Sequence, residues 1–319
     1  MRIVLSKKGY DSSYGGIPSP VFVDEQDKDW NDRMFSFPIP EAPLNSLKTF
    51  VDTGTHQCDI EYPFGVAPIV KSPHFGGDET CVHLDPDIRK WLHKELPKGW
   101  VPSLGQNGGF VTEIMDTPPF KKNRDDEILF LFFGSFNHYR KTGDQWTEDK
   151  KQEPFHAIWG FLHTDRIIEL DDNCDVKKKY GWHPHCSPNW PDELDKNNRL
   201  FVAENPTWML NEHCIPSCGV FCYDEMLRLS KDGCTRTKWR LNALPWICAN
   251  HKDSHMTHQL EKAFDNEDKE YFRAASIGQE LVVTIEHVEK CRKIVDWLDK
   301  IFLEKKLIDT RWEANAKAR

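Results

Sequence analysis

The sequence ILFLFFGSF, residues 128–136, is an uninterrupted apolar run. Such a run predicts a strand that is buried on both faces of a sheet. A second apolar run, HAIWGFLHTDRIIEL at 156–170, carries Gly160 in its middle, which predicts a bulge or a tight bend. The charged segment 141–153 separates the two runs. We therefore expect them to be neighbouring strands of an antiparallel sheet, joined by a long excursion.

Shorter elements are expected on both sides of this pair. Strands are predicted at 2–6 (RIVLS), 34–39 (MFSFPI) and 199–203 (RLFVA), and helices at 87–96 (DIRKWLHKEL), 258–275 and 288–307. The last helix carries apolar residues at helical spacing from Val288 to Phe302, which predicts one face packed on the body. The predicted fold class is α+β, with a central mixed, largely antiparallel sheet, helices packed on it and a C-terminal helix.

Composition limits the classes of partner. The chain has 319 residues, of which 39% are hydrophobic and 12% aromatic, as is typical of a packed globule. Its formal net charge of −9 disfavours binding to a long DNA duplex and favours a small ligand or a single flipped nucleotide. With no signal-peptide pattern and no apolar run of about 20 residues, no membrane partner is expected. The scattered cysteines favour reduced thiols and a cytoplasmic or nuclear location. No feature assigns a cofactor or an oligomeric state.

The polar loop after the first predicted strand is the first candidate site. Ligands commonly bind where strands end, and the backbone of Gly15 and Gly16 can approach a ligand closely and form an anion nest. The loop also supplies a carboxylate and hydroxyls, from Asp11, Ser12 and Ser13, and it is preceded by Lys7 and Lys8. An ordinary glycine–serine turn is the alternative. The loop is not a Walker loop, because no Gly-Lys-Ser/Thr follows.

Several motifs, taken in order, resemble the Nmad3 family, the third nucleotide-modification-associated domain. They are RIVLSKKGYDSSYGGIPSPVF (2–22), FSFPIPE (35–41), CVHLDPDI (81–88), ILFLFFGSF (128–136), FHAIWGFLHTDRII (155–168), HPH (183–185), NNRLFVA (197–203) and IGQELVV (277–283). The resemblance implies a single domain over 1–319 with a role linked to modified nucleotides, but it supplies no reaction. The chain departs from the family pattern at GSFNHYR (134–140) and in 204–275, where we expect an insertion.

The segment His83-Leu84-Asp85-Pro86-Asp87 is the second candidate site. In an extended chain His83, Asp85 and Asp87 share one face. Two carboxylates and an imidazole suit general acid–base chemistry or a hard divalent cation. The alternative is a helix N-terminus with Asp85 as the N-cap and Pro86 in the first turn. The family resemblance favours a functional role for Asp85.

Two further groups have spacings related to metal sites. His183 and His185 lie on one side of an extended chain, as some metal sites require, while histidines that only cap a loop are the alternative. Cys214, Cys218 and Cys222 would line one face of a helix, yet their spacing fits neither zinc ribbons nor iron–sulfur sites. No metal site is therefore predicted, and His183 and His185 are assigned to nucleotide binding.

Gln279 and Glu280 stand directly before the apolar residues LVV. An amide and a carboxylate at the entry of a strand can hydrogen-bond to the Watson–Crick edge of a base. The alternative is a plain turn into a strand. The family resemblance favours both as pocket residues.

These candidates predict an enzyme, or an enzyme-like domain, that acts on a nucleotide or nucleobase in nucleic-acid modification. Asp11 or Asp85 would be the acid or base, the serines and glycines of the first loop would hold phosphate, and Gln279 with Glu280 would orient the base. The partner would be a nucleotide or a modified nucleic acid. The alternative function is a non-catalytic reader of a modified base, with Trp159 or Phe161 as a stacking platform. We expect the candidate segments to surround one cavity.

Overall fold

The computed structural model describes most of the chain. The described residues are 2–9, 17–24, 26–40, 82–93, 95–116, 127–143, 145–170, 174–186, 196–247, 270–274, 280–283, 292–304 and 306–317.

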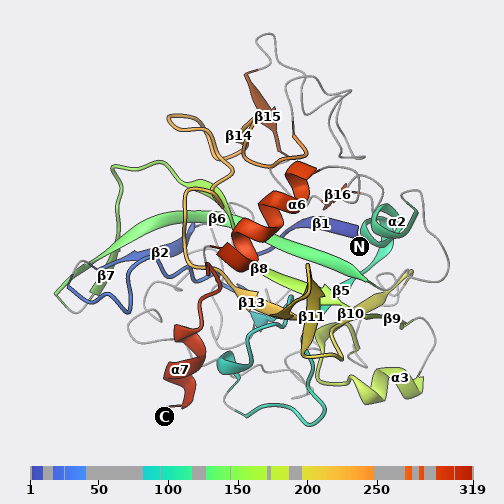
Figure 1. Cartoon of the computed structure of the whole chain (residues 1–319). Helices are drawn as coiled ribbons and strands as arrows, with labels where there is room; N and C mark the ends of the chain where they lie inside the picture. Colours follow the sequence, from blue (N-terminus) through green and yellow to red (C-terminus); the bar gives the residue numbers. More distant parts are fainter. Residues whose placement is uncertain are drawn as a thin grey trace.

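A mixed sheet forms the centre of the fold, and its strand order is β13-β8-β6-β1-β16 (Figure 1). Its two long strands are the two apolar runs, β6 (Ile128–Thr142) and β8 (Phe155–Thr164), which pair antiparallel. The remaining strands are β1 (Arg2–Lys7), β2 (Ser19–Val23), β7 (Gln145–Glu148), β13 (Cys218–Val220) and β16 (Glu280–Val283). Only the pairings of β1 and β2 with β6 are parallel, and the other described pairings of this sheet are antiparallel, so the expected mixed, largely antiparallel sheet is confirmed.

Strands β1 and β2 lie end to end along the same edge of β6. β1 pairs with residues 128–133 and β2 pairs with residues 136–140. Gly134 lies between these two stretches, and a Cβ there would stand 2.8 Å from the carbonyl oxygen of Lys8. Because Gly134 has no side chain, the carbonyl group of Lys8, which follows β1, can lie close to the backbone of β6.

The bulge expected near Gly160 is present. Phe132 pairs with Gly160 while Phe133 pairs with Ile158, so Trp159 is the extra residue of β8. Because side chains alternate along β6, Phe132 and Phe133 mark the two sides of the sheet, which we call the Phe132 side and the Phe133 side.

The Phe132 side is covered by a second, three-stranded sheet of order β5-β10-β9. Its strands are β5 (Ser103–Gln106), β9 (Arg166–Glu169) and β10 (Arg199–Val202), and Phe201 of β10 packs edge-on against Phe130 at 5.1 Å. The segment 82–92 also lies on this side, where the guanidinium of Arg89 stands 5.0 Å from the Trp159 ring.

The Phe133 side is covered by C-terminal elements. α6 (Arg292–Asp299) continues into the π-helical turn η6 (Lys300–Glu304), whose Phe302 packs against Phe161 at 4.9 Å. The predicted C-terminal helix is thus present where it is described, although its sequence positions 288–291 lie outside the described residues. Figure 1 shows α6 lying across β6 and β8. Trp239 of β14 (Lys238–Arg240) meets Phe133 at 5.1 Å.

The smaller elements complete the list. They are β3 (Ile39–Pro40), β4 (Val82–His83), η2 (Lys90–Leu92), α2 (Gly108–Asp116), α3 (Cys174–Lys179), η3 (Pro184–Cys186), β11 (Thr207–Leu210), β12 (His213–Pro216), β15 (Tyr271–Arg273) and α7 (Arg311–Lys317). No helix in the described ranges is long and apolar enough to cross a membrane.

The helix predicted at 87–96 is wrong. Among its described residues only the 3-10 turn η2 is helical, because the backbone of Asp87 is already paired with Ser103 of β5 through two hydrogen bonds of 2.9 and 3.0 Å. Arg89 has φ −121° and ψ 77°, outside the helical region. The interpretation of Asp85 as a helix N-cap is wrong for the same reason.

Two other predictions need correction. The strand expected at 34–39 is reduced to a bridge between Met34 and Val21 and to the two-residue β3, since Pro38 and Pro40 remove ladder donors. The helix expected at 258–275 is wrong at its described end, where β15 pairs antiparallel with β14.

Candidate functional site

A cluster of polar side chains on the Phe132 side is centred on the buried carboxylate of Asp85. The backbone N–H of Gly105 donates to its Oδ1 at 2.8 Å, and Nζ of Lys8 lies 3.6 Å from Oδ2. Nε2 of His183 is 3.6 Å from Oδ1 and Nε2 of His185 is 3.8 Å from Oδ2. One carboxylate therefore faces an ammonium group and two imidazoles, and the side chains of all four are at most 12% exposed.

Gly105 is what allows His185 to reach this position. A Cβ on Gly105 would stand 2.3 Å from Cδ2 and 2.7 Å from Nε2 of the His185 ring. The ring of His185 thus lies directly against the backbone of β5 at Gly105, the residue whose N–H donates to Asp85. Any side chain at position 105 would displace either the ring or the strand.

The hydrogen bonds of the two histidines assign them opposite tautomers. Nδ2 of Asn198 donates to the carbonyl oxygen of His185 at 3.1 Å, which leaves Oδ1 of Asn198 to accept from Nδ1 of His185 at 2.8 Å. Nδ1 of His183 instead accepts the backbone N–H of His185 at 3.2 Å. In the neutral state His183 therefore carries its proton on Nε2, and His185 presents a lone pair on Nε2.

This arrangement suits proton transfer better than metal ligation. Histidines that bind a metal through Nε2 usually donate their Nδ1–H to a partner, whereas Nδ1 of His183 is an acceptor. The described residues contain no group of three or more His, Cys, Asp and Glu side chains that could hold a metal ion. Nε2 of His183 has no hydrogen-bond partner in the described part of the chain, although its side chain is fully buried.

A second polar group lies next to the first through consecutive residues of β5. Oε1 of Glu280 accepts the hydroxyl of Ser6 at 2.8 Å and the amide N–H of Gln106 at 2.9 Å. Ser6 is the register partner of Glu280 in the pairing of β1 with β16. Because Gln106 follows Gly105, the carboxylates of Asp85 and Glu280 are held by neighbouring residues of the same strand.

The structure thus places four predicted residues in two neighbouring groups, with Asp85, His183 and His185 in the first and Glu280 in the second. The others lie outside the described residues; they are Asp11, Ser12, Ser13, Gly15, Gly16 and Gln279. The prediction of one common cavity is likewise untested for the first loop beyond Gly9.

Sequence analysis missed Ser6, Gly105, Gln106 and Asn198. The stretch LGQNGG at 104–109 is a strand end followed by polar and glycine residues, the same signal that drew attention to the first loop. It was overlooked because no apolar run marks β5.

Other candidates lie elsewhere. The carboxylate of Asp87 accepts from Nε1 of Trp100 at 2.8 Å and contacts Nε2 of His93 at 3.0 Å, away from Asp85's partners. The proposed stacking platforms, Trp159 and Phe161, are at most 1% exposed, so neither ring can stack on a base. The side chain of His83 lies outside the described part.

The three cysteines do not share a helix. Cys214 is in β12, Cys218 is in β13, and Cys222 accepts a hydrogen bond from Nη2 of Arg311 at 3.3 Å. Burial raises the pKa of the Cys218 thiol to about 12 and that of Cys222 to about 11, so both thiols are protonated at neutral pH and poorly reactive.

Together, these features define an α+β protein with a buried acid–histidine cluster between its central and its three-stranded sheet. The sequence model of the family called nucleotide modification associated domain 3 (Nmad3) matches residues 2–284, which include every residue of this cluster. The chain belongs to this family. No curated protein and no solved structure matches it.

Proposed function

We propose that the chain is an enzyme that acts on a nucleotide or nucleobase in nucleic-acid modification, with Asp85, His183 and His185 as its acid–base group. The observation that carries this proposal is the opposite tautomers of the two histidines on one buried carboxylate. A base needs a lone pair and a developing anion needs a donor, and the pair supplies one of each.

In this proposal Nε2 of His185 takes a proton from the attacking hydroxyl or water, and Asp85 stabilises the imidazolium that forms. His183 stays neutral and donates a hydrogen bond from Nε2 to negative charge that develops on the substrate, because losing that proton would leave an imidazolate. Neutral imidazoles are known in this electrophilic role. Lys8 adds positive charge beside the carboxylate of Asp85.

The remaining predicted residues complete the substrate site in the same proposal. Glu280 and Gln279 orient the base, and Gln106 and Ser6 fix the carboxylate of Glu280. Asp11, Ser12, Ser13 and the backbone of Gly15 and Gly16 contact the phosphate. The family name, which refers to nucleotide modification, supports this choice of substrate class.

The alternative function is a reader that binds a modified base without turnover. Burial of Trp159 and Phe161 removes the stacking platforms on which that alternative rested. A reader would also have no use for a histidine pair with opposite tautomers.

The first test is of the tautomers themselves. Long-range ¹⁵N–¹H spectra of the histidine rings at pH 7.5 should show Nε2–H for His183 and Nδ1–H for His185, assigned with His183→Gln and His185→Gln. The same tautomer for both would remove the basis of the proposal.

The second test is for turnover. The purified chain is incubated with deoxynucleoside 5′-monophosphates and single-stranded oligonucleotides in a desalted cell extract, and the nucleosides are analysed by mass spectrometry. A new nucleoside mass that His185→Gln abolishes supports the proposal. The exposed His213→Gln is the matched control and should retain the activity. Binding without any mass change would support the reader.

A further inference from the structure

Arg89 is a buried cation that the acid–base chemistry proposed for the Asp85 cluster does not use. It is only 3% exposed, and its Nη1 donates to the carbonyl oxygen of Ser36 at 2.6 Å. Its guanidinium carbon lies 5.0 Å from the centre of the Trp159 ring and 5.6 Å from that of Phe35. Burying a cation is costly, and the planar guanidinium suits both kinds of contact. Arg89 therefore joins its own segment to two others.

The segments that Arg89 joins belong to different layers of the fold. Trp159 is the bulged residue of β8 in the central sheet. Arg89 instead follows Asp87, whose backbone is paired with Ser103 of β5 in the covering sheet. Asp85 accepts a hydrogen bond from the same strand. Arg89 thus connects the layer that carries Asp85 to the central sheet.

The hydrogen bond to Ser36 extends this connection to the first loop. Gly9 has a φ of +97°, and a Cβ on Gly9 would overlap with Oγ of Ser36, so the start of the loop lies directly against Ser36. Lys8 belongs to the central sheet, because its backbone N–H donates to the carbonyl oxygen of Phe133 at 2.8 Å. Its Nζ lies 3.6 Å from the carboxylate of Asp85. The contact of Lys8 with Asp85 therefore joins the same two layers as Arg89 does.

Aromatic rings support the partners of Arg89. Phe35 lies 5.9 Å from Trp91 and 5.8 Å from Trp312, and Trp91 stacks on Trp312 at 4.8 Å with 5° between the ring planes. Trp312 is in α7, which follows the residues that the family model matches. The C-terminal helix therefore packs on both the segment of Arg89 and the segment of Ser36.

We infer that Arg89 is a positioning residue, which holds Asp85 and its histidines at a fixed place relative to Lys8 and the first loop. The inference rests on the proposed function, in which the first loop contacts the phosphate and the Asp85 cluster serves the reacting group. Both groups must meet one substrate, and a misplacement of about 1 Å can lower the rate about 10²-fold. Arg89 acts through Ser36 and Trp159 in this role.

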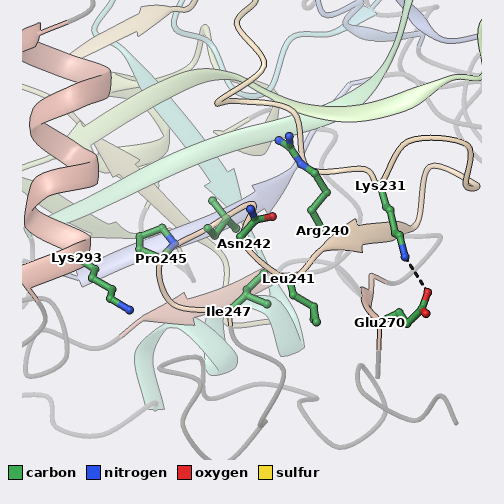
Figure 2. A pocket seen from close by; sticks show the side chains of 9 residues that line it. Lys231, Arg240, Leu241, Asn242, Pro245, Ile247, Glu270 and Lys293 are labelled. Carbon is green, nitrogen blue, oxygen red and sulfur yellow. Dashed lines mark hydrogen bonds and ion pairs between the residues drawn. The ribbon is translucent and has the colours of Figure 1, made fainter. Parts of the chain in front are cut away.

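The first measurement is the accessibility of the Lys8 amine, which requires no turnover. The folded chain receives a short pulse of an acetylating reagent, and peptide mass spectrometry gives the acetylation rate of each lysine. Lys8 should react slowly in the parent, because its side chain is only 12% exposed. Lys231 is the internal reference; it pairs with Glu270 at 2.9 Å beside the pocket shown in Figure 2.

Three variants separate position from charge. Arg89→Met removes the hydrogen bond to Ser36 and should raise the Lys8 acetylation rate about tenfold, because Lys8 is released more often. Arg89→Lys keeps the charge but not the planar, ring-stacked donor, so it should also raise the rate. Arg33→Met is the matched control and should leave Lys8 unchanged, since Arg33 is another buried arginine, 1% exposed and 4.7 Å from the ring of Trp312.

The second measurement follows the histidines and the turnover. In Arg89→Met the ring ¹⁵N signals of His183 and His185 should shift, and turnover per folded molecule should fall about tenfold, mainly in kcat. Arg89→Lys should show the same changes to a smaller extent. Arg33→Met should change neither the signals nor the turnover, although it lowers the stability.

Equal Lys8 acetylation in Arg89→Met and the parent would overturn the inference. Equal effects of Arg89→Met and Arg33→Met would overturn it too, and so would parent-like behaviour of Arg89→Lys, because charge and not position would then explain the result. Circular dichroism checks folding, and if Arg89→Met does not fold, Arg89→Lys decides. A chain without turnover would refute the proposed function while the acetylation rates still test the position of Lys8, so the two failures are distinguishable.

Discussion

Asp85 and Asp87 are two residues apart in the same segment, yet their surroundings differ in kind. Asp87 accepts from Trp100 at 2.8 Å and contacts His93 at 3.0 and 3.1 Å, and its backbone is paired with Ser103. Within the described part of the chain, Asp85 accepts the N–H of Gly105 at 2.8 Å, and side-chain nitrogen atoms of Lys8, His183 and His185 lie 3.6 to 3.8 Å from its oxygens, among other contacts. Both carboxylates are buried, so burial does not distinguish them.

The difference lies in the kinds of group that surround each carboxylate. A group held by short, charge-assisted hydrogen bonds stabilises the fold. A buried acid with basic neighbours at distances that a substrate or a proton can bridge is typical of a catalytic site. We therefore expect substitutions at Asp85 to change activity and substitutions at Asp87 to change stability.

The largest effect is expected for Asp85→Asn on turnover. The amide keeps the shape and the hydrogen bond to Gly105 but removes the charge that stabilises the His185 imidazolium. The turnover detected by mass spectrometry should fall about 10²–10⁴-fold, while the unfolding free energy changes by no more than about 1 kcal/mol. A variant that unfolds easily but is fully active when folded would place Asp85 with Asp87 as a structural residue.

Gly105→Ala should be the most destabilising of the conservative substitutions near the site. Its Cβ would overlap the ring of His185, which Asn198 holds in place. We expect a loss of about 3 kcal/mol in chemical denaturation and a shifted His185 ring signal.

Gly109→Ala is the control for Gly105→Ala. No atom lies within 4 Å of the new Cβ, and the residue is in the first turn of α2. That variant should be as stable as the parent or slightly more stable. Equal stability of the two alanine variants would show that His185 does not rest on β5.

Asp87→Asn should destabilise the protein by about 2 kcal/mol, because one charge-assisted hydrogen bond to Trp100 or His93 is weakened or lost. Urea denaturation followed by circular dichroism measures the change. Turnover per folded molecule should stay within a factor of about two of the parent. A large loss of turnover at full stability would assign Asp87 to the active site.

Two buried histidines, His163 and His156, predict how the stability of the protein depends on pH. Burial lowers the pKa of His163 to about 4, and its ring stacks on Trp208 at 4.5 Å. Burial also holds the pKa of His156 well below its usual range, and Nδ1 of His156 accepts from Trp239 at 3.1 Å. Both rings are neutral in the folded state, so the unfolded state binds more protons below pH 6.5 and stability falls as the pH falls.

For His163 alone the loss is about 1.4 kcal/mol at pH 5.5 relative to pH 7.5. Denaturation at these two pH values measures it, and His163→Phe should reduce the difference by about that amount. An unchanged pH dependence in His163→Phe would show that this histidine is not buried as a neutral ring.

The central strands could be predicted because each one is encoded by a continuous apolar run of its own residues. Long apolar runs such as 128–136 and 155–164 gain enough from burial to form strands with any suitable partner. The helix at 87–96 was predicted wrongly, because the backbone of Asp87 forms hydrogen bonds with Ser103 and not with its own segment. No property of the local sequence announces that pairing.

The sequence by itself predicted the two long central strands, the fold class and the family, and it nominated the polar residues Asp85, His183, His185 and Glu280. Only the tertiary structure decided which of these residues meet, and it added Ser6, Gly105, Gln106 and Asn198. The physical reason is that hydrophobic burial is non-directional and leaves a pattern of apolar residues within one segment. A buried strand can therefore be recognised from that segment alone. Hydrogen bonds can join atoms from distant segments, such as Ser6 and Glu280, which are 274 residues apart, and these atoms come together only when the chain has folded.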